Sequence, residues 1–265
     1  MVTEMNKVNQ IERRTRILEL IQQQGIVVVS DLCELFGVSE MTIRRDLCDM
    51  DREGLLRRVH GGAVNSLGRS YEPPYVLRST QNAEAKRRIG RKAAELIYEG
   101  DSIALDVGTT TLEIARAIQH CHNITVVTSS LPIANEIATN CSLENNIRLI
   151  LTGGIVRTGE LSMIGMFPER VYADLHVDRA FIGVGGLSLK DGLTEYNLED
   201  ALIKRRLLAS AHQVIVVADS SKFGKTTFAT VGPLSMVNVI ITDVDAPADQ
   251  VQALREMGIS VLIAE

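Results

Sequence analysis

Two adjacent arginines, Arg44 and Arg45, stand where the sequence predicts a short amphipathic helix. Ser39 is the candidate N-cap, and the apolar positions recur at spacings of four and three residues: Ile43, Leu47 and Met50. This apolar stripe must face a core. The opposite face then carries Met41, Arg44, Arg45 and Cys48. A helix anchored on one side, with paired arginines on the other, fits the major groove of double-stranded DNA.

More basic residues follow this helix, in a segment that predicts a small β-hairpin. Residues 55–64 are strand-like, turn at Gly61 and Gly62, and continue into a second short apolar stretch. Arg57, Arg58 and His60 lie on this hairpin, where they can contact the phosphate backbone of DNA. Arginines on the outside of a helix are otherwise a common feature of a solvated face. A helix, a turn, a second helix and a basic hairpin within about 35 residues favour DNA binding over that alternative.

A second set of candidate residues lies at the ends of predicted strands in the rest of the chain. These ends are rich in glycine and hydroxyl side chains: residues 106–111, 128–130, 153–154 and 219–222. In an open α/β sheet, ligands bind at the edge formed by the carboxyl ends of the strands. Gly108 lets the backbone approach closely, while the hydroxyls of Thr109, Thr110 and Thr111 and the free N–H groups of the next helix face a bound anion. The same residues are also compatible with a plain turn and helix cap.

Further side chains at this edge can complete a site for a phosphorylated ligand. Lys222 can add a positive charge near the phosphate, and Asp106 can accept hydrogen bonds from sugar hydroxyls. The remaining candidates are Ser129, Ser130, Gly153, Gly154, Arg157, Glu195 and Asn197. Glu199 can reach sugar hydroxyls, or it can simply compensate the dipole in the first turn of a helix. Together the strand ends favour a phosphorylated ligand.

Five segments carry a resemblance to a known family: Met41-Thr42-Ile43-Arg44-Arg45-Asp46-Leu47, Arg57-Arg58-Val59-His60-Gly61-Gly62-Ala63, Asp106-Val107-Gly108-Thr109-Thr110-Thr111, Thr128-Ser129-Ser130-Leu131-Pro132-Ile133-Ala134 and Ala218-Asp219-Ser220-Ser221-Lys222-Phe223-Gly224. With them, the chain resembles the DeoR family of bacterial transcriptional regulators over nearly its whole length beyond the first ten residues. The resemblance implies a repressor of sugar metabolism that is released by a phosphorylated sugar. It places Thr42 among the DNA-binding residues, and it implies a second domain similar to sugar-phosphate isomerases.

The pattern of apolar and polar segments predicts three parts. Residues 11–65 are expected to form a winged helix-turn-helix domain, residues 66–81 a linker, and residues 82–265 an α/β domain for effector binding and oligomerisation, with a mainly parallel sheet. The strands of the α/β domain are expected at residues 102–106, 124–128, 147–151, 179–184, 213–218, 239–242 and 260–263, the last as a candidate edge strand. Its helices are expected near residues 111–119, 132–139, 167–174, 197–211 and 248–257. Another helix, at residues 82–98, has a basic outer face that includes Lys86 and is interpreted as solvated.

An isomerase-like enzyme that carries a DNA-binding domain is the main alternative. An aldose–ketose isomerase needs a base beside the substrate carbonyl. In the isomerases that this domain resembles, an acid-rich loop follows a central strand, whereas residues 183–188 here contain no carboxylate and the next one is Asp191. Asp106 and Glu195 remain as alternative bases, but the pattern favours binding without catalysis.

The composition excludes several classes of protein. With 45% hydrophobic and 23% charged residues the chain is globular, and no apolar run reaches the roughly 18 residues of a membrane span. A net charge of −5 argues against non-specific coating of nucleic acid, and 4% aromatic residues without Trp disfavour a reader of single strands or RNA. The four cysteines show no metal-ligand spacing and no disulfide pattern, so neither a metal nor a cofactor is expected.

The few basic groups of one copy would bind DNA weakly, because phosphate contacts supply much of the affinity. A homodimer or homotetramer is therefore expected on operator DNA. The N-terminus has no hydrophobic signal core, which predicts a cytoplasmic protein.

Overall fold

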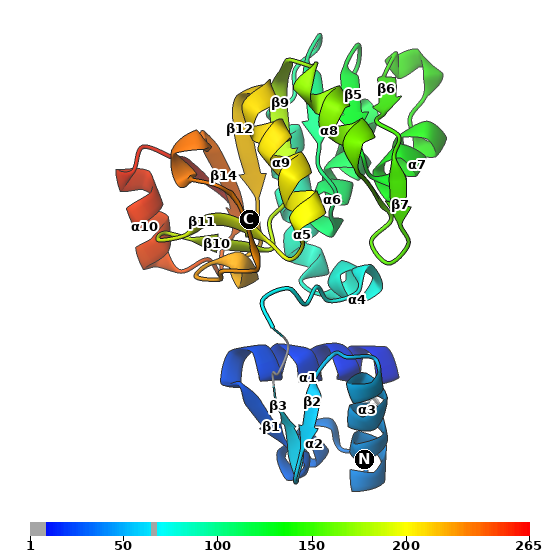
Figure 1. The fold of residues 1–265 in the computed structure, drawn as a ribbon, viewed down its shortest axis with the longest axis vertical. Coiled ribbons are helices and arrows are strands. Elements are labelled where there is room, and N and C mark those ends of the chain that lie inside the picture. Colours follow the sequence, from blue (N-terminus) through cyan, green and yellow to red (C-terminus); the bar gives the residue numbers. More distant parts are fainter. Residues whose placement is uncertain (1–8, 65–67) are drawn as a thin grey trace, which may run out of the picture. The chain divides into compact units, whose positions relative to one another are not determined.

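The computed structural model describes residues 9–64 and 68–265, which fall into two compact units. The units are Met1–Pro73 and Pro74–Glu265. Figure 1 shows both units and labels many of their helices and strands. None of the helices in the described ranges combines the length and the apolar composition needed to cross a bilayer.

The N-terminal unit contains three helices and a small antiparallel sheet. The helices are α1 (Gln10–Gln24), α2 (Val29–Phe36) and α3 (Glu40–Arg52), and the strands β1 (Ile26–Val28), β2 (Arg57–Val59) and β3 (Gly62–Val64) pair in the order β1-β3-β2. The apolar stripe predicted on α3 is buried, since Ile43, Leu47 and Met50 are at most 1% exposed. The predicted hairpin is formed by β2 and β3. These elements confirm the winged helix-turn-helix fold.

A buried ion pair joins α1 to α3. Asp46 is 1% exposed, and its carboxylate accepts hydrogen bonds from Arg13 Nε at 2.6 Å and from Gln10 Nε2 at 3.2 Å. Arg14 Nε lies 3.6 Å from the same carboxylate. Asp46 stands directly after the exposed arginines in sequence, but it faces the opposite way and fixes α3 against α1. Loss of one partner would leave an uncompensated charge in the core.

The second unit is built on a seven-stranded sheet with the order β15-β14-β12-β9-β4-β5-β6. Its strands are β4 (Ser102–Leu105), β5 (Thr125–Thr128), β6 (Arg148–Leu151), β9 (Val177–Ile182), β12 (Ala211–Val217), β14 (Val239–Asp243) and β15 (Ser260–Ala264). All neighbouring strands pair in parallel. The seven predicted strands and the edge position of the last one are therefore confirmed, and so is the predicted α/β class.

Helices cover both faces of this sheet (Figure 1). One face packs on α5 (Ala83–Ala94), α6 (Thr109–Ala117) and α7 (Leu131–Asn140), and the other on α8 (Met166–Ala173), α9 (Leu198–Ser210) and α10 (Ala248–Glu256). Each face has its own cluster of buried apolar side chains, as expected for a parallel sheet. The strands run in one direction, so their carboxyl ends lie along one edge of the sheet.

Several short elements were not predicted. Helix α4 (Tyr75–Thr80) occupies the end of the segment expected to be a linker and belongs to the second unit, while residues 65–67 lie outside the described residues. The strands β7 (Ile155–Arg157) and β8 (Ser162–Ile164) form a hairpin, and β10 (Gly186–Ser188), β11 (Gly192–Glu195) and β13 (Ala229–Gly232) form a small sheet. Strands of three or four residues are too short to give a clear alternation in the sequence.

Replacement of Asp46 by Asn should destabilise the N-terminal unit by about 3 kcal/mol, because the buried Arg13 guanidinium would lose the carboxylate that lies 2.6 Å from its Nε. Asp49→Asn is the control, since this half-buried carboxylate contacts Arg14, which also pairs with Glu53. The control should cost less than about 1 kcal/mol. Native-state hydrogen exchange of amides in α1 and α3 of the full chain measures both effects. Equal losses in the two variants would contradict the role assigned to Asp46.

Candidate functional site

The exposed face of α3 carries most of the predicted DNA-binding residues. Ser39 is the N-cap, and its Oγ accepts a hydrogen bond from the backbone N–H of Thr42 at 3.3 Å and lies 2.9 Å from Thr42 Oγ1. Both hydroxyls are therefore engaged in starting the helix. Met41, in the first turn, is 76% exposed.

Arg44 and Arg45 are both exposed, but they differ in their contacts. Arg44 Nη2 lies 2.5 Å from Glu40 Oε1, an exposed pair that is worth little in free energy and can rearrange. Among the described residues Arg45 forms no ion pair or hydrogen bond. Its guanidinium is therefore available to an anionic partner without breaking an existing contact.

The hairpin also presents its predicted basic residues to solvent. Arg57 and Arg58 are exposed on β2, whose register with β3 pairs Arg57 with Val64 and Val59 with Gly62. His60 is exposed in the two-residue turn, next to Gly61 with a φ of 77°. The first unit thus has two basic surfaces, on α3 and on the hairpin.

In the second unit, the residues predicted to form an anion cradle lie at the N-terminus of α6. Gly108 precedes the helix with a φ of 152°, a conformation that L side chains rarely adopt. Thr109, Thr110 and Thr111 form the first turn and are at most 8% exposed. Thr111 Oγ1 donates to the carbonyl oxygen of Gly108 at 3.1 Å. The first N–H groups of any α-helix lack acceptors within the helix, so this turn is suited to an anion.

Asp106 is bound to a lysine that the sequence analysis missed. Its Oδ2 accepts hydrogen bonds from Lys204 Nζ and from the backbone N–H of Gly183, the latter at 3.0 Å. Lys204 Nζ also donates to the carbonyl oxygen of Gly183 at 2.9 Å and lies 3.3 Å from Glu195 Oε2. Asp106, Lys204 and Glu195 are all buried. This cluster ties the ends of β4, β9 and β11 to α9.

Burial raises the pKa of Asp106 to about 6, and the Lys204 ammonium limits that rise. Gly185 allows Glu195 to approach, because a Cβ there would lie 2.8 Å from Glu195 Oε1. Lys204 had a signal in the sequence, although a weak one. It falls on the apolar face of α9, between the buried residues Ala201 and Leu207.

Of the predicted residues around the start of α9, two are bonded to Asp200 and one is exposed to solvent. Asn197 is the N-cap, accepting from the backbone N–H of Asp200 at 2.8 Å and donating to Asp200 Oδ2 at 2.8 Å. Arg157 pairs with the same Asp200 oxygen. Glu199 is exposed in the first turn of the helix, which matches dipole compensation. Asp200, its neighbour, takes the buried position and was not predicted.

The ends of β5 and β6 bring the remaining small residues to the same edge. The register of β4 and β5 pairs Leu105 with Thr128, which places Asp106 next to Ser129. Ser129 is fully buried, whereas Ser130 caps α7 by accepting from the N–H of Ile133 at 3.4 Å. Gly153 and Gly154 form the turn after β6, with φ angles of 73° and 125°.

A cluster of lysines lies at the end of β12. Lys222 is half-buried, with its Nζ 6.0 Å from the centre of the Tyr196 ring. Burial lowers the pKa of Lys86 to about 8, and the charges of Lys222 and Asp219 also act on it. Burial, followed by the charge of Lys222, lowers the pKa of Lys225 to about 8. Three ammonium groups therefore gather at this edge, close to Asp219.

The expected solvation of Lys86 is wrong. Its ammonium is buried and donates to the carbonyl oxygens of Arg78 and of Gln81, the latter at 2.6 Å. These carbonyls belong to α4 and the residue after it, an element that was not predicted. Because the acceptors come from outside the helix that carries Lys86, periodicity within that helix could not reveal the burial.

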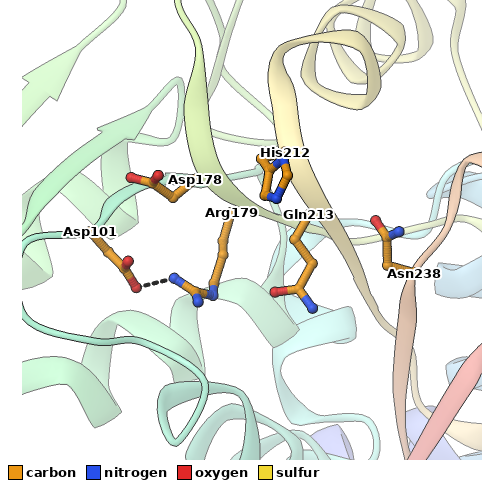
Figure 2. Close-up of a pocket in the computed structure, with 6 residues that line it drawn as sticks. All are labelled: Asp101, Asp178, Arg179, His212, Gln213 and Asn238. Atoms are coloured by element: carbon orange, nitrogen blue, oxygen red, sulfur yellow. Dashed lines mark hydrogen bonds and ion pairs between the residues drawn. The ribbon is translucent and has the colours of Figure 1, made fainter.

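Figure 2 shows a pocket at the opposite edge of the sheet, where β4, β9, β12 and β14 begin. Its volume is about 460 Å³, and the lining residues are Asp101, Asp178, Arg179, His212, Gln213 and Asn238. Its charged groups are engaged within the protein. Arg179 pairs with Asp101, and Asp178 accepts from the N–H of Ser102 at 2.8 Å. None of the predicted site residues lines this pocket.

Comparison with known proteins agrees with both units. Residues 13–66 match the DeoR-like helix-turn-helix domain, and residues 81–244 match the DeoR C terminal sensor domain. The chain belongs to the DeoR family. The resemblance carried by the sequence motifs is thereby confirmed.

Named relatives of this DeoR-family chain are regulators. It is 33% identical over 252 residues to the glycerol-3-phosphate regulon repressor of Escherichia coli strain K12, covering 95% of this chain and 98% of the relative. It is 35% identical over 253 residues to the HTH-type transcriptional regulator GlpR of Haloferax volcanii, covering 95% and 96%.

Two solved structures illustrate a distant similarity to the DeoR-family chain. The full-length sorbitol operon regulator SorC of Klebsiella pneumoniae matches with a TM-score of 0.42 and 13% identity, over 93% of this chain and 99% of that one. Ribose 5-phosphate isomerase A of Methanocaldococcus jannaschii matches with a TM-score of 0.39 and 16% identity, over 54% and 55%. Neither likeness is strong enough to support a functional argument.

Replacement of Lys204 by Met should destabilise the second unit by roughly 3–5 kcal/mol at pH 8, because the buried Asp106 and Glu195 carboxylates would lose their counter-charge. The loss should be smaller at pH 5, where Asp106 takes up a proton at little cost. The double variant Asp106→Asn, Lys204→Met should recover part of the stability. Urea unfolding of the full chain measures all three proteins. A double variant less stable than Lys204→Met would contradict this pairing.

Sulfate should bind at the lysine cluster with an affinity that falls as the pH rises. Lys86 and Lys225 lose their protons near pH 8 in the free protein, so above that pH a bound anion must bring a proton with it. Titration calorimetry should show at least about a tenfold weakening between pH 7 and pH 9.5. Lys222→Gln should weaken binding at every pH, whereas Lys92→Gln, at a half-buried lysine of α5 that pairs with Glu95, should leave it unchanged. A pH-independent affinity would contradict the assignment.

Proposed function

We propose that this protein is a transcriptional repressor that binds operator DNA and is released by a phosphorylated sugar. The operator contacts come from α3 and the β2–β3 hairpin, and the sugar phosphate binds at the carboxyl ends of the strands in the second unit. The target is an operon for carbohydrate use, and the protein acts in the cytoplasm. The named relatives, one of them a repressor of the glycerol-3-phosphate regulon, support this proposal.

The observation that carries the proposal is the two-sided character of α3. One side is held in the core by the apolar stripe and by the Asp46–Arg13 pair. The other side exposes Arg45, which has no ion pair or hydrogen bond to residues 9–64 or 68–265, beside Met41 and Arg44. A helix held in this way, with the Arg45 guanidinium exposed, is suited to bidentate contacts with guanine in a major groove.

The ligand half of the proposal rests on the division of charge along the strand ends. The α6 N-terminus and the lysines at residues 86, 222 and 225 can hold a phosphate. Asp106 and Glu195 lie toward α9 and can face the sugar. A ligand with one anionic end and one hydroxyl-rich end matches both parts.

The contacts of the carboxylates favour a protein that binds the sugar phosphate without isomerising it. Asp106 and Glu195, the two alternative bases, both contact Lys204, so neither carboxylate can approach a substrate carbon without giving up that contact. Asp191 accepts a hydrogen bond from Thr226 Oγ1 at 2.7 Å and is exposed. An isomerase would need a base that is free to move a proton beside the carbonyl.

Control by the ligand requires two states with different affinities for it. A homodimer or homotetramer supplies them, because the ligand can favour one arrangement of the copies over the other. Two copies also place two α3 helices on the DNA, which raises the affinity beyond the few phosphate contacts of one copy.

Replacement of Arg45 by Ala tests the DNA-binding half. The variant should bind a duplex that the wild-type protein has selected from a random-sequence pool about ten- to a hundredfold more weakly, as expected for loss of one base contact. Arg52→Ala is the matched control, since this exposed arginine lies in the last turn of the same helix. Fluorescence anisotropy measures DNA binding, and protection of the second unit by sulfate should be equal in all three proteins. Unchanged DNA affinity in Arg45→Ala would refute the assignment of α3.

A further inference from the structure

Five buried polar atoms, at the carboxyl ends of β4 and β5 and on β8, α8 and α9, have no hydrogen-bond partner in the described part of the chain. They are Asp106 Oδ1, Ser129 Oγ, Ser162 Oγ, Tyr172 OH and Asp200 Oδ1. Their residues are at most 4% exposed. Buried polar atoms are normally satisfied, so such a group implies water or a ligand at this place.

The five side chains are neighbours in the fold. The register of β4 and β5 sets Asp106 beside Ser129, and the Tyr172 hydroxyl lies close enough to Ser129 to interact with it. Ser162 is held next to this pair, because the N–H of Met163 donates to the Ser129 carbonyl oxygen at 2.7 Å. Lys204 bonds Asp106 and lies one turn after Asp200 on α9, near enough for the two charges to interact.

Each of the two aspartates has one oxygen that accepts hydrogen bonds and one oxygen without a donor among the residues that the structure describes. Asp106 Oδ2 is taken by Lys204 and Gly183, and Asp200 Oδ2 by Arg157 and Asn197. Both Oδ1 atoms can only accept a hydrogen bond while the carboxylates are ionised. A hydroxyl group can donate to them and also accept from Ser129, Ser162 or Tyr172. A ligand carboxylate has no hydrogen to donate.

The charges around these five side chains also disfavour a ligand carboxylate. Three buried carboxylates, those of Asp106, Glu195 and Asp200, face two cations, Lys204 and Arg157. A further negative group at this place would be buried without a counter-charge, which is costly in a dry site. The phosphate end of the ligand avoids this problem, since the lysines lie at the end of β12.

We propose that Asp106, Ser129, Ser162, Tyr172 and Asp200 form a subsite for the hydroxyl-bearing carbons of the effector, which selects uncharged polyol or sugar phosphates over phosphorylated sugar acids. This inference rests on the proposed function, because it concerns the same ligand. It specifies the chemistry of the part of the ligand that carries no phosphate, which the anion cradle alone does not define.

Matched ligand pairs test the selection. Glycerol 3-phosphate is compared with 3-phosphoglycerate, erythritol 4-phosphate with 4-phosphoerythronate, and glucitol 6-phosphate with 6-phosphogluconate, each pair differing by a terminal CH₂OH or carboxylate. Titration calorimetry on the full chain should show at least about a tenfold preference for the polyol phosphate at every chain length that binds. Equal or tighter binding of the acid would overturn this inference alone. Failure of all six compounds to bind would overturn the ligand half of the proposed function as well.

Two variants test the residues without removing a charge. Ser162→Ala and Tyr172→Phe should each weaken the tightest polyol phosphate by about three- to tenfold, as expected for loss of one hydrogen bond, and leave sulfate affinity unchanged. Ser210→Ala is the control, because this buried serine donates only within its own helix, to Leu207 O at 3.2 Å. Variants that bind the polyol phosphate as tightly as wild type would show that these atoms hold water instead, and would overturn the subsite.

Discussion

The ion pair between Asp106 and Lys204 is the interaction on which the second unit depends most. It joins the end of a central strand to α9, and through Gly183 and Glu195 it also holds the ends of β9 and β11. Neither charge is tolerable alone in this interior, because a buried ion without a partner costs several kcal/mol. The pair therefore sets the position of every strand end that surrounds it.

The N-terminal unit uses the same device for a different purpose. Asp46 and Arg13 hold α3 against α1, so the helix that exposes Arg45 has a fixed orientation. Apolar packing alone is less directional, since it depends mainly on the area removed from water. A buried ion pair adds hydrogen bonds of defined geometry, and we interpret both pairs as devices for orientation more than for stability.

Cationic groups and carboxylates occupy different places along the strand ends of the second unit. Lysines and the N-terminus of α6 supply positive potential on one side, while the carboxylates around Lys204 supply acceptors on the other. At the start of α9, Asp200 is buried and contacts Arg157, whereas Glu199 is exposed.

Local patterns in the sequence were sufficient for the elements and for the exposed residues. The stripe of Ile43, Leu47 and Met50 oriented α3 correctly, and runs of apolar residues located all seven strands of the main sheet. These features depend on periodicities of two or about four residues within one segment. The family motifs added the kind of function, which periodicity does not contain.

Only the tertiary structure revealed the partners of the buried charges. Arg13 meets Asp46 across 33 positions, and Lys204 meets Asp106 across 98. Lys86 was misjudged for the same reason, because its acceptors belong to a different helix. A buried charge is recognised by what lies opposite it, and that depends on how distant segments pack. The sequence by itself therefore determined which residues could bind, while the packing decided which of them are already bound to one another.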